Sequence, residues 1–183
     1  MRIFLAVFPS AEAQDAAARV IERLRGDGDG VSWVRRDNLH YTLRFMGELG
    51  ESGLARVTEA AREAASDHAT FTAALGAAGA FPNARRTRVV WLGLAQGGDA
   101  LVALARSVEQ ALRRRGFDAA DRAFKPHLTI GRVRHRDEDW TARLAGVAAD
   151  PSPRFAVDRV SVVRSTLNPK GSIYEVRAEA ALR

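Results

Sequence analysis

The 183-residue sequence contains no cysteine. This absence excludes a disulfide-stabilised scaffold, a thiol nucleophile, a zinc site with cysteine ligands and an iron–sulfur cluster. Hydrophobic residues make up 46% of the chain, which excludes a disordered protein. A chain of this length can bury enough apolar surface to fold without a metal or a disulfide. We therefore expect a single domain over residues 1–183, composed of two small halves that share a core.

Long hydrophobic runs are also absent. No apolar stretch approaches the ~20 residues that a membrane-spanning helix requires. The N-terminus resembles a secretion signal for only seven residues, because Pro9 and Glu12 interrupt it and no small-residue cleavage pattern follows. A first β-strand is the better interpretation of this segment. We expect a soluble, cytoplasmic protein without a membrane partner, and a reducing compartment suits a chain without cysteine.

Lysine is nearly absent, since Lys125 and Lys170 are the only two, and arginine carries almost all the positive charge. The 28 Lys and Arg residues outnumber the 22 Asp and Glu residues and give a net charge of +6. This balance favours polyanionic partners such as nucleic acid, although a biased genomic base composition also produces Arg-rich chains. The planar arginine fork suits phosphate. The run 113–115 ends an expected helix, where cations are favourable, so the run 85–88 is the better candidate for guiding a polyanion.

Hydrophobic periodicity divides the chain into interleaved helices and strands. Helices are predicted over 11–25, 52–65 and 99–115, with a short one near 137–147. Strands are predicted over 2–8, 31–34, 39–45, 70–75, 88–94, 126–133, 154–165 and 173–178. Because strands often follow strands directly, this order predicts an α+β fold with antiparallel-rich sheets, or a split βαβ arrangement, rather than a doubly wound parallel sheet.

One short pattern occurs twice. Residues 39–43 read Leu-His-Tyr-Thr-Leu and residues 126–130 read Pro-His-Leu-Thr-Ile, 87 positions later, which is about half the chain. Side chains two residues apart on a strand point to the same side, so each motif presents an imidazole and a hydroxyl on one face. If two similar lobes pack about a pseudo-twofold axis, both motifs converge on one central cleft.

Two histidines without further ligands suit acid–base chemistry better than metal binding. Imidazole titrates near ~6.5, so at neutral pH one ring can accept a proton while the other donates one. The hydroxyls of Thr42 and Thr129 can donate to phosphate oxygens, where negative charge grows in the transition state. Arg132, near the end of the second strand, can add a charged donor. The pattern fits a substrate in which one P–O bond breaks as another forms.

A single His-x-Thr on a strand arises often by chance, and a lone histidine there is usually structural. The half-chain repeat favours function for His40 and His127. His68 and His135 lie in polar or charged connections, so we expect them at the surface. Trp33 and Phe45 flank strands, which favours packing over stacking on a base. No acidic cluster has the spacing of metal ligands.

The sequence resembles the 2H phosphoesterases, and closely the RNA 2′,3′-cyclic phosphodiesterases, also called 2′-5′ RNA ligase-like proteins. The similarity covers nearly the whole chain, and the doubled histidine motif with its flanks is specific. Gly131 is a small variation at a position that is often alanine in the family. The matching segments are 2–7, 33–34, 38–48, 81–82, 88–93, 125–132 and 165–167, with Gly171 and Tyr174.

This resemblance implies a two-lobed α+β fold with a central cleft. It implies hydrolysis of RNA or nucleoside 2′,3′-cyclic phosphate ends to a 2′-phosphate, without a metal or another cofactor. His40 would be the proton donor to the departing 3′ oxygen, and His127 the proton acceptor that activates water. Thr42 and Thr129 would bind the phosphoryl oxygens. The near-symmetric motifs do not themselves decide which histidine is the acid.

Other functions stay open at this point. The family also has a 2′-5′ RNA ligase activity, which we expect to be secondary because water competes with the RNA hydroxyl. A non-catalytic RNA-binding module fits the basic charge. A 2H enzyme for another cyclic phosphate or a 2′–5′ oligonucleotide shares the chemistry and differs in the pocket. We expect a monomer.

Overall fold

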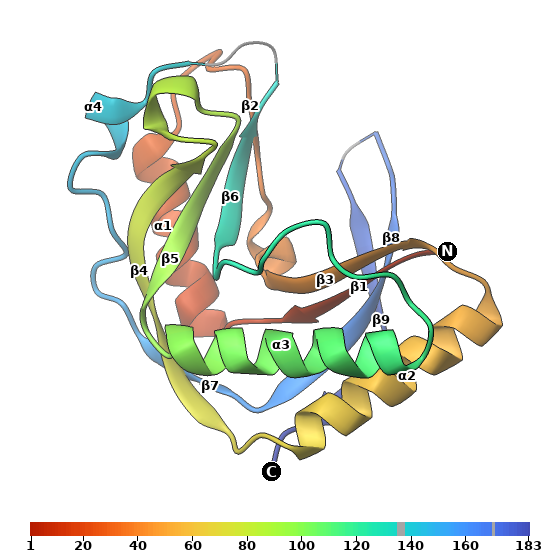
Figure 1. Ribbon diagram of the computed structural model, residues 1–183. Coiled ribbons are helices and arrows are strands. Elements are labelled where there is room, and N and C mark those ends of the chain that lie inside the picture. The colour runs from red at the N-terminus through yellow and green to blue at the C-terminus, as the bar shows by residue number, and fades with distance from the viewer. Residues whose placement is uncertain (135–137, 170) are drawn as a thin grey trace.

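The computed structural model describes residues 1–134, 138–169 and 171–183 (Figure 1). Within these residues, nine strands form one sheet, against which three long helices pack. The strands are β1 (Arg2–Val7), β2 (Val31–Trp33), β3 (Tyr41–Glu48), β4 (Phe71–Phe81), β5 (Val89–Gln96), β6 (Leu128–Val133), β7 (Arg154–Val157), β8 (Arg159–Thr166) and β9 (Ile173–Ala181). The helices are α1 (Ala11–Leu24), α2 (Glu51–Ser66), α3 (Gly98–Arg114) and the one-turn α4 (Thr141–Leu144), with two 3-10 turns, η1 (Arg36–Asn38) and η2 (Ala84–Arg86).

The sheet has the order β7-β4-β5-β6-β3-β1-β8-β9, and β2 also pairs with β6. Every pairing is antiparallel. We call β1, β3, β8 and β9 lobe 1, and β2, β4, β5, β6 and β7 lobe 2. The lobes meet where β3 pairs with β6, and Figure 1 shows them rising on opposite sides of this junction. The predicted two-lobed α+β fold is confirmed, with the strands of both lobes joined in one curled sheet.

The two faces of the sheet have different surroundings. On β1, Ile3 and Leu5 are fully buried in the main core, together with the apolar stripes of α1, α2 and α3. The alternate residues Phe4 and Ala6 form a second, small apolar cluster with Val163 of β8. We call the face that carries Phe4 and Ala6 the inner face. Because the helices pack on the other side, no helix covers the inner face at this cluster.

Local sequence explains where the helices begin. Ser10 accepts a hydrogen bond from the backbone N–H of Ala13 at 3.3 Å and caps α1, as its residue type predicts. Before α3, Gly97 has φ of 83°, and a Cβ there would lie 2.7 Å from the carbonyl oxygen of Thr72. Only glycine fits this turn, which brings α3 back over the sheet.

Three predicted elements differ from the structure in more than the exact position of their ends. The strand predicted over 70–75 extends to Phe81 in the structure. The sequence does not predict the extension, because the small residues of 76–80 give a weak strand signal, yet small residues are needed there. At Gly79, for example, a Cβ would lie 2.4 Å from the Trp91 ring. The strand over 154–165 is two strands, since the chain leaves lobe 2 after β7 and enters lobe 1 at β8. The helix near 137–147 is only the single turn of α4, and 137 lies outside the described residues.

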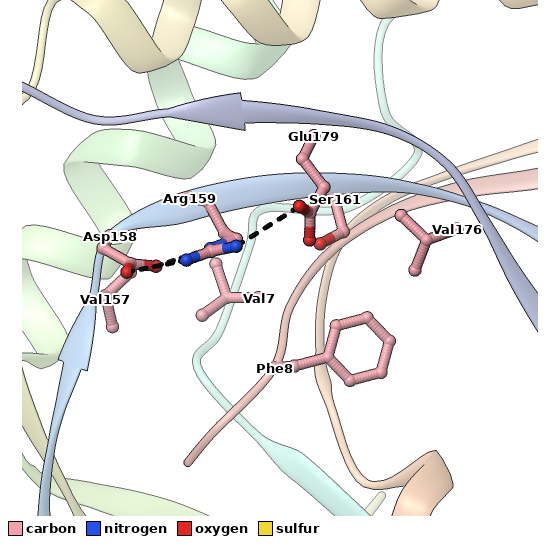
Figure 2. Close-up of a pocket in the computed structure, with 8 residues that line it drawn as sticks. All are labelled: Val7, Phe8, Val157, Asp158, Arg159, Ser161, Val176 and Glu179. Carbon is pink, nitrogen blue, oxygen red and sulfur yellow. Dashed lines mark hydrogen bonds and ion pairs between the residues drawn. The ribbon is translucent and has the colours of Figure 1, made fainter.

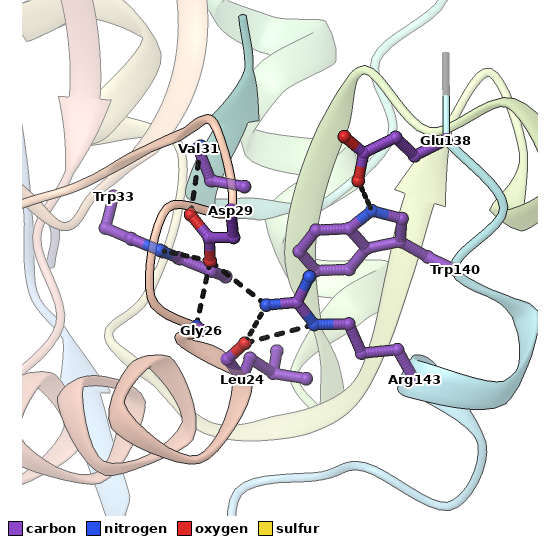
Figure 3. Close-up of polar contacts among 8 residues, drawn as sticks. All are labelled: Leu24, Gly26, Asp29, Val31, Trp33, Glu138, Trp140 and Arg143. Atoms are coloured by element: carbon purple, nitrogen blue, oxygen red, sulfur yellow. Dashed lines mark hydrogen bonds and ion pairs between the residues drawn. The ribbon is translucent and has the colours of Figure 1, made fainter. Parts of the chain in front are cut away.

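A polar cluster holds β2 and α4 against the end of α1 (Figure 3). Asp29 accepts hydrogen bonds from the backbone N–H of Val31 at 3.0 Å and from Trp33 Nε1 at 3.2 Å. The Arg143 guanidinium pairs with Asp29 at 3.0 Å, donates to the Leu24 carbonyl, and lies 3.9 Å from the centre of a Trp ring, that of residue 140. The cluster therefore fixes the position of β2, which borders the end of β6.

Candidate active site

The two His-x-Thr segments meet at the junction of the lobes, where Tyr41 pairs with Leu128. Both of these side chains are buried in the main core. Their sequence neighbours on either side, which are the histidine and threonine of each motif, therefore point to the inner face. Both histidines precede their strands by one residue, whereas the sequence predicts them within the strands. β3 and β6 begin one residue after the histidines because Tyr41–Leu128 is the single pair between these two strands.

The antiparallel register places the four motif residues around one point. With Tyr41 opposite Leu128, His40 is set opposite Thr129, and Thr42 is set opposite His127. His40 Nε2 lies 2.9 Å from Thr42 Oγ1. All four side chains are half-buried. The structure thus brings together the two imidazoles and two hydroxyls that the sequence motifs predict.

Both imidazoles are held in the same way. His40 Nδ1 lies 2.7 Å from the carbonyl oxygen of Asn38, and His127 Nδ1 lies 2.7 Å from that of Lys125. A carbonyl oxygen only accepts, so each Nδ1 carries a hydrogen and donates. In the neutral ring, Nε2 is then the atom that carries the lone pair, and in His40 it accepts a hydrogen bond from Thr42 Oγ1. Each histidine can use Nε2 to take up or release a proton.

Aromatic rings surround the two histidines unequally. The His40 ring lies 4.8 Å from Phe4, 5.6 Å from Phe8 and 5.3 Å from Tyr174, between ring centres, with Tyr174 at 84°. The His127 ring lies 5.0 Å from Phe81 at 82°. These contacts fix the ring planes. Phe4, Phe8 and Phe81 are not among the predicted site residues, and the only sequence signal for the first two is that they alternate with the apolar stripe of β1.

Burial lowers the pKa of both histidines. For His40, the nearby charges of His127 and Arg132 lower the pKa further, while the hydrogen bond to Asn38 opposes the shift. For His127, the charge of Arg132 also lowers the pKa, and the hydrogen bond to Lys125 raises it. The protein without an anion therefore favours two neutral rings. The same effects show that the two histidines and Arg132 share one electrostatic environment.

Arg132 reaches the site because β6 contains a β-bulge. On a regular strand, a residue five positions after His127 points to the opposite face. In the ladder with β5, Val90 pairs with Gly131 and Trp91 pairs with Thr129, so residue 130 is an extra residue in β6. The bulge reverses the alternation, and the exposed side chain of Arg132 returns to the inner face. The charge effects on both histidines agree with this placement.

Gly131 itself lies on the core face against β2. A Cβ there would lie 2.8 Å from Trp33 Cε3 and 2.9 Å from Val31 Cγ1. Trp33 is half-buried and packs against the main core, as the sequence predicts. The glycine therefore lets β2 pack closely on the strand that carries His127 and Arg132.

A cavity of about 280 Å³ lies beside Phe8 on the inner face of lobe 1 (Figure 2). Phe8 lines it and also contacts His40. Its charged groups neutralise one another, because Arg159 pairs with Asp158 at 2.8 Å and with Glu179 at 3.2 Å. Its remaining lining residues are Val7, Val157, Ser161 and Val176. None of the four motif residues lines this cavity, and it offers no unpaired positive charge to a phosphate.

The other histidines and aromatics lie away from this point or outside the described residues. His68 is half-buried after α2, and its Nε2 lies 2.8 Å from Ser107 Oγ of α3, so it joins two helices instead of lying free at the surface. His135 falls outside the described residues. Phe45 is 52% exposed, with the Arg2 guanidinium 5.5 Å from its ring centre, whereas the sequence predicts packing. Its partner in the ladder is Phe4, so it lies on the open inner face.

Within the described parts of the chain, no group of three or more His, Cys, Asp or Glu side chains could hold a metal ion. No helix among the same residues is long and apolar enough to cross a membrane.

The family model described as the 2′-5′ RNA ligase superfamily matches residues 13–169. This chain belongs to the 2′-5′ RNA ligase superfamily. Two similar curated proteins are each named RNA 2′,3′-cyclic phosphodiesterase. The one from Thermotoga maritima is 33% identical over 179 residues, 98% of this chain and 94% of that protein. The one from Methanothermobacter thermautotrophicus is 36% identical over 176 residues, 95% of each chain.

Two solved structures share the fold over the whole length of this chain. TT0787 of Thermus thermophilus is 28% identical, with a TM-score of 0.86, and the match covers 100% of this chain and 98% of that one. Escherichia coli LigT in complex with 3′-AMP is 26% identical, with a TM-score of 0.77, and the match covers 99% of this chain and 97% of that one. The resemblance that the histidine motifs indicate is confirmed at the level of the family and the fold.

Proposed function

We propose that this protein hydrolyses the 2′,3′-cyclic phosphate at the end of an RNA, or of a nucleoside, to a 2′-phosphate. The names of the full-length curated relatives support this substrate class. The observation that carries the proposal is the matched pair of Nδ1 hydrogen bonds on the inner face, because it leaves two Nε2 atoms for proton transfer beside two hydroxyls.

In the proposed reaction, a water oxygen bonds to phosphorus as the bond from phosphorus to the 3′ oxygen breaks. His127 Nε2 takes the proton from the water, and His40 Nε2 gives its proton to the departing 3′ oxygen. Thr42 and Thr129 donate hydrogen bonds to the non-bridging oxygens, and Arg132 adds positive charge where negative charge grows. Exchange with solvent then restores a protonated His40 and a neutral His127.

The lowered pKa of His40 in the protein alone does not conflict with its role as the acid. A cyclic phosphate is an anion, and an opposite charge within a few ångströms favours the protonated imidazole. Substrate binding therefore raises the pKa that burial and the nearby cations lower. His40 takes up its proton in the complex, where the proton is needed.

The test is incubation with the four nucleoside 2′,3′-cyclic phosphates in the presence of EDTA, with the products identified by phosphorus NMR. We expect 2′-phosphates, and a loss of roughly 10²- to 10⁴-fold in turnover for His40→Ala and for His127→Ala. His68→Ala serves as the matched control, since that ring lies between α2 and α3. Turnover near the wild-type rate in either site variant, or activity that EDTA abolishes, would contradict the proposal.

The same experiment separates the alternatives. A non-catalytic RNA-binding module would leave all four substrates intact and would still bind RNA after both histidines are replaced. A 2H enzyme for another substrate would turn over a different cyclic phosphate or a 2′–5′ oligonucleotide. RNA ligation is proposed only as a secondary activity, in which an RNA hydroxyl replaces water at the same site. We also propose that the protein acts as a monomer, which its mass by light scattering tests.

A further inference from the structure

Two arginine-bearing segments of lobe 2, far apart in the sequence, lie side by side above the candidate site. The backbone N–H of Val133 donates to the carbonyl of Arg88 at 3.0 Å, which joins segment 85–88 to the end of β6. Arg85, Arg132 and Arg134 are all exposed. We call these three arginines the basic rim. The rim lies where β5 begins and β6 ends, and β2 pairs with this end of β6; Figure 1 shows β2 beside β6.

Two members of the basic rim, Arg132 and Arg134, continue the inner face away from the four motif residues. The β-bulge places Arg132 on the inner face, and Arg134, two residues later, shares that direction. Pairing continues through Arg134, whose backbone N–H donates to Gly30 at 2.9 Å. Arg134 Nε also donates to Ser32 Oγ, and Ser32 is the residue paired with Arg132. The two residues therefore follow one another along the strand, with about 6.6 Å between their Cα atoms.

The charge of this rim is poorly neutralised. Among the described residues, Arg134 forms no ion pair, and its side-chain partner is the neutral Ser32. Arg85 has a charged neighbour in Asp139, whose carboxylate also accepts from the backbone N–H of residue 141.

The opposite wall of the inner face differs in this respect. In the cavity beside Phe8, Arg159 is held by two carboxylates. The surroundings of this cavity therefore offer less unpaired positive charge to a chain of phosphates than the basic rim does.

We propose that the basic rim binds the phosphates of the RNA nucleotides that precede the cyclic end. This inference rests on the proposed function, because it assumes that the cyclic phosphate occupies the four motif residues. A cyclic mononucleotide has no phosphate beyond that point, so the rim acts on an RNA chain and not on the mononucleotide. The rim thus makes RNA ends better substrates than free cyclic nucleotides.

The experiment compares two substrates, cytidine 2′,3′-cyclic phosphate and a hexaribonucleotide that ends in a 2′,3′-cyclic phosphate. The variants are Arg134→Gln and Arg85→Gln. One lost phosphate contact lowers the slope of log affinity against log salt by about 0.7 and weakens binding roughly 5-fold at 0.1 M salt. We expect this loss in KM for the hexamer, with kcat/KM for the mononucleotide unchanged. Arg113→Gln, on α3 away from lobe 2, is the matched control for the loss of one surface charge, and we expect it to change neither substrate.

Several results would overturn the inference. One is an equal loss on both substrates, and another is no loss on the hexamer in either variant. A third is the same loss on a hexamer whose upstream links are uncharged methylphosphonates, since the contacts would then be to sugars or bases. Failure of the proposed function looks different, because the wild-type protein would then hydrolyse neither substrate. If the wild type hydrolyses both equally well, with no dependence on salt, the inference about the rim alone fails.

Discussion

The side-chain amide of Asn38 donates a hydrogen bond to the carbonyl oxygen of Ser172 at 2.8 Å, across 134 residues of sequence. The carbonyl oxygen of the same Asn38 accepts from His40 Nδ1 at 2.7 Å. Tyr174, two residues after Ser172, contacts the His40 ring, with 5.3 Å between the ring centres. Asn38 therefore links the segment that orients His40 to the strand that packs against it.

This relationship predicts that Asn38→Ala lowers kcat about 10-fold, because a small misplacement of a reacting group is costly. The variant keeps the backbone carbonyl that accepts from His40 Nδ1, so His40 retains its tautomer. It loses the hydrogen bond from the Asn38 side chain to Ser172, which holds that carbonyl in place. KM should change much less, since Thr129 and Arg132 belong to β6. Steady-state kinetics on a cyclic mononucleotide measure both values.

If Asn38 had only a structural role, Asn38→Ala would lower stability without lowering kcat. Ser152→Ala is the control for such a purely structural loss. Ser152 Oγ donates to the Leu75 carbonyl at 2.8 Å, also between a part-buried side chain and a distant backbone group. Each variant should lose about 1 kcal/mol of unfolding free energy. We expect a fall in kcat for Asn38→Ala only. Equal kcat values in the two variants would remove Asn38 from the positioning of His40.

The sequence predicts the main residues of the site because strand alternation and the repeated motif depend on local spacing. The partners of these residues depend on long-range packing. Tyr174 reaches His40 from the far end of the chain, and nothing in its own segment indicates that contact. The direction of Arg132 depends on a bulge set by pairing with β5, so spacing from His127 alone gives the wrong face. Strand ends are equally non-local, as the division between β7 and β8 shows.

Gly131→Ala should destabilise the protein by about 1–3 kcal/mol, the usual effect of overpacking a core. The new Cβ would lie 2.8 Å from the Trp33 ring, which Asp29 holds through its Nε1. The indole therefore cannot move aside without breaking that hydrogen bond. Urea unfolding at neutral pH measures the change.

Gly98→Ala is the control for this substitution. Gly98 begins α3, and a Cβ there meets no atom within 4 Å. We expect no loss of unfolding free energy from it, because alanine is favourable in a helix. If Gly131→Ala unfolds at the same urea concentration as the wild type, β2 does not pack on β6 as closely as the structure indicates.

Anion binding should depend on pH through the two histidines. Burial and nearby cations lower the pKa of His40 and His127 in the protein alone, and a bound anion raises it. Sulfate suits the test, because it keeps its charge across the neutral range and resembles the phosphate group. Sulfate binding should therefore be accompanied by proton uptake, and its affinity should fall as pH rises above the raised pKa.

In the protein without an anion, the lowered pKa values of the two histidines should also make the unfolding free energy depend on pH. In the unfolded chain a histidine titrates near ~6.5, above its lowered pKa in the folded protein. Between these two values the unfolded chain binds more protons than the folded protein. The stability that each neutral histidine contributes is therefore fully present above ~6.5, and the unfolding free energy falls as pH drops below that value.

His40→Gln removes one such group and should make unfolding less dependent on pH from 7.5 to 5.5. It should also reduce the proton uptake that calorimetry in buffers of different ionisation enthalpy detects with sulfate. Unchanged proton uptake in both His40→Gln and His127→Gln would show that sulfate binds away from the two imidazoles.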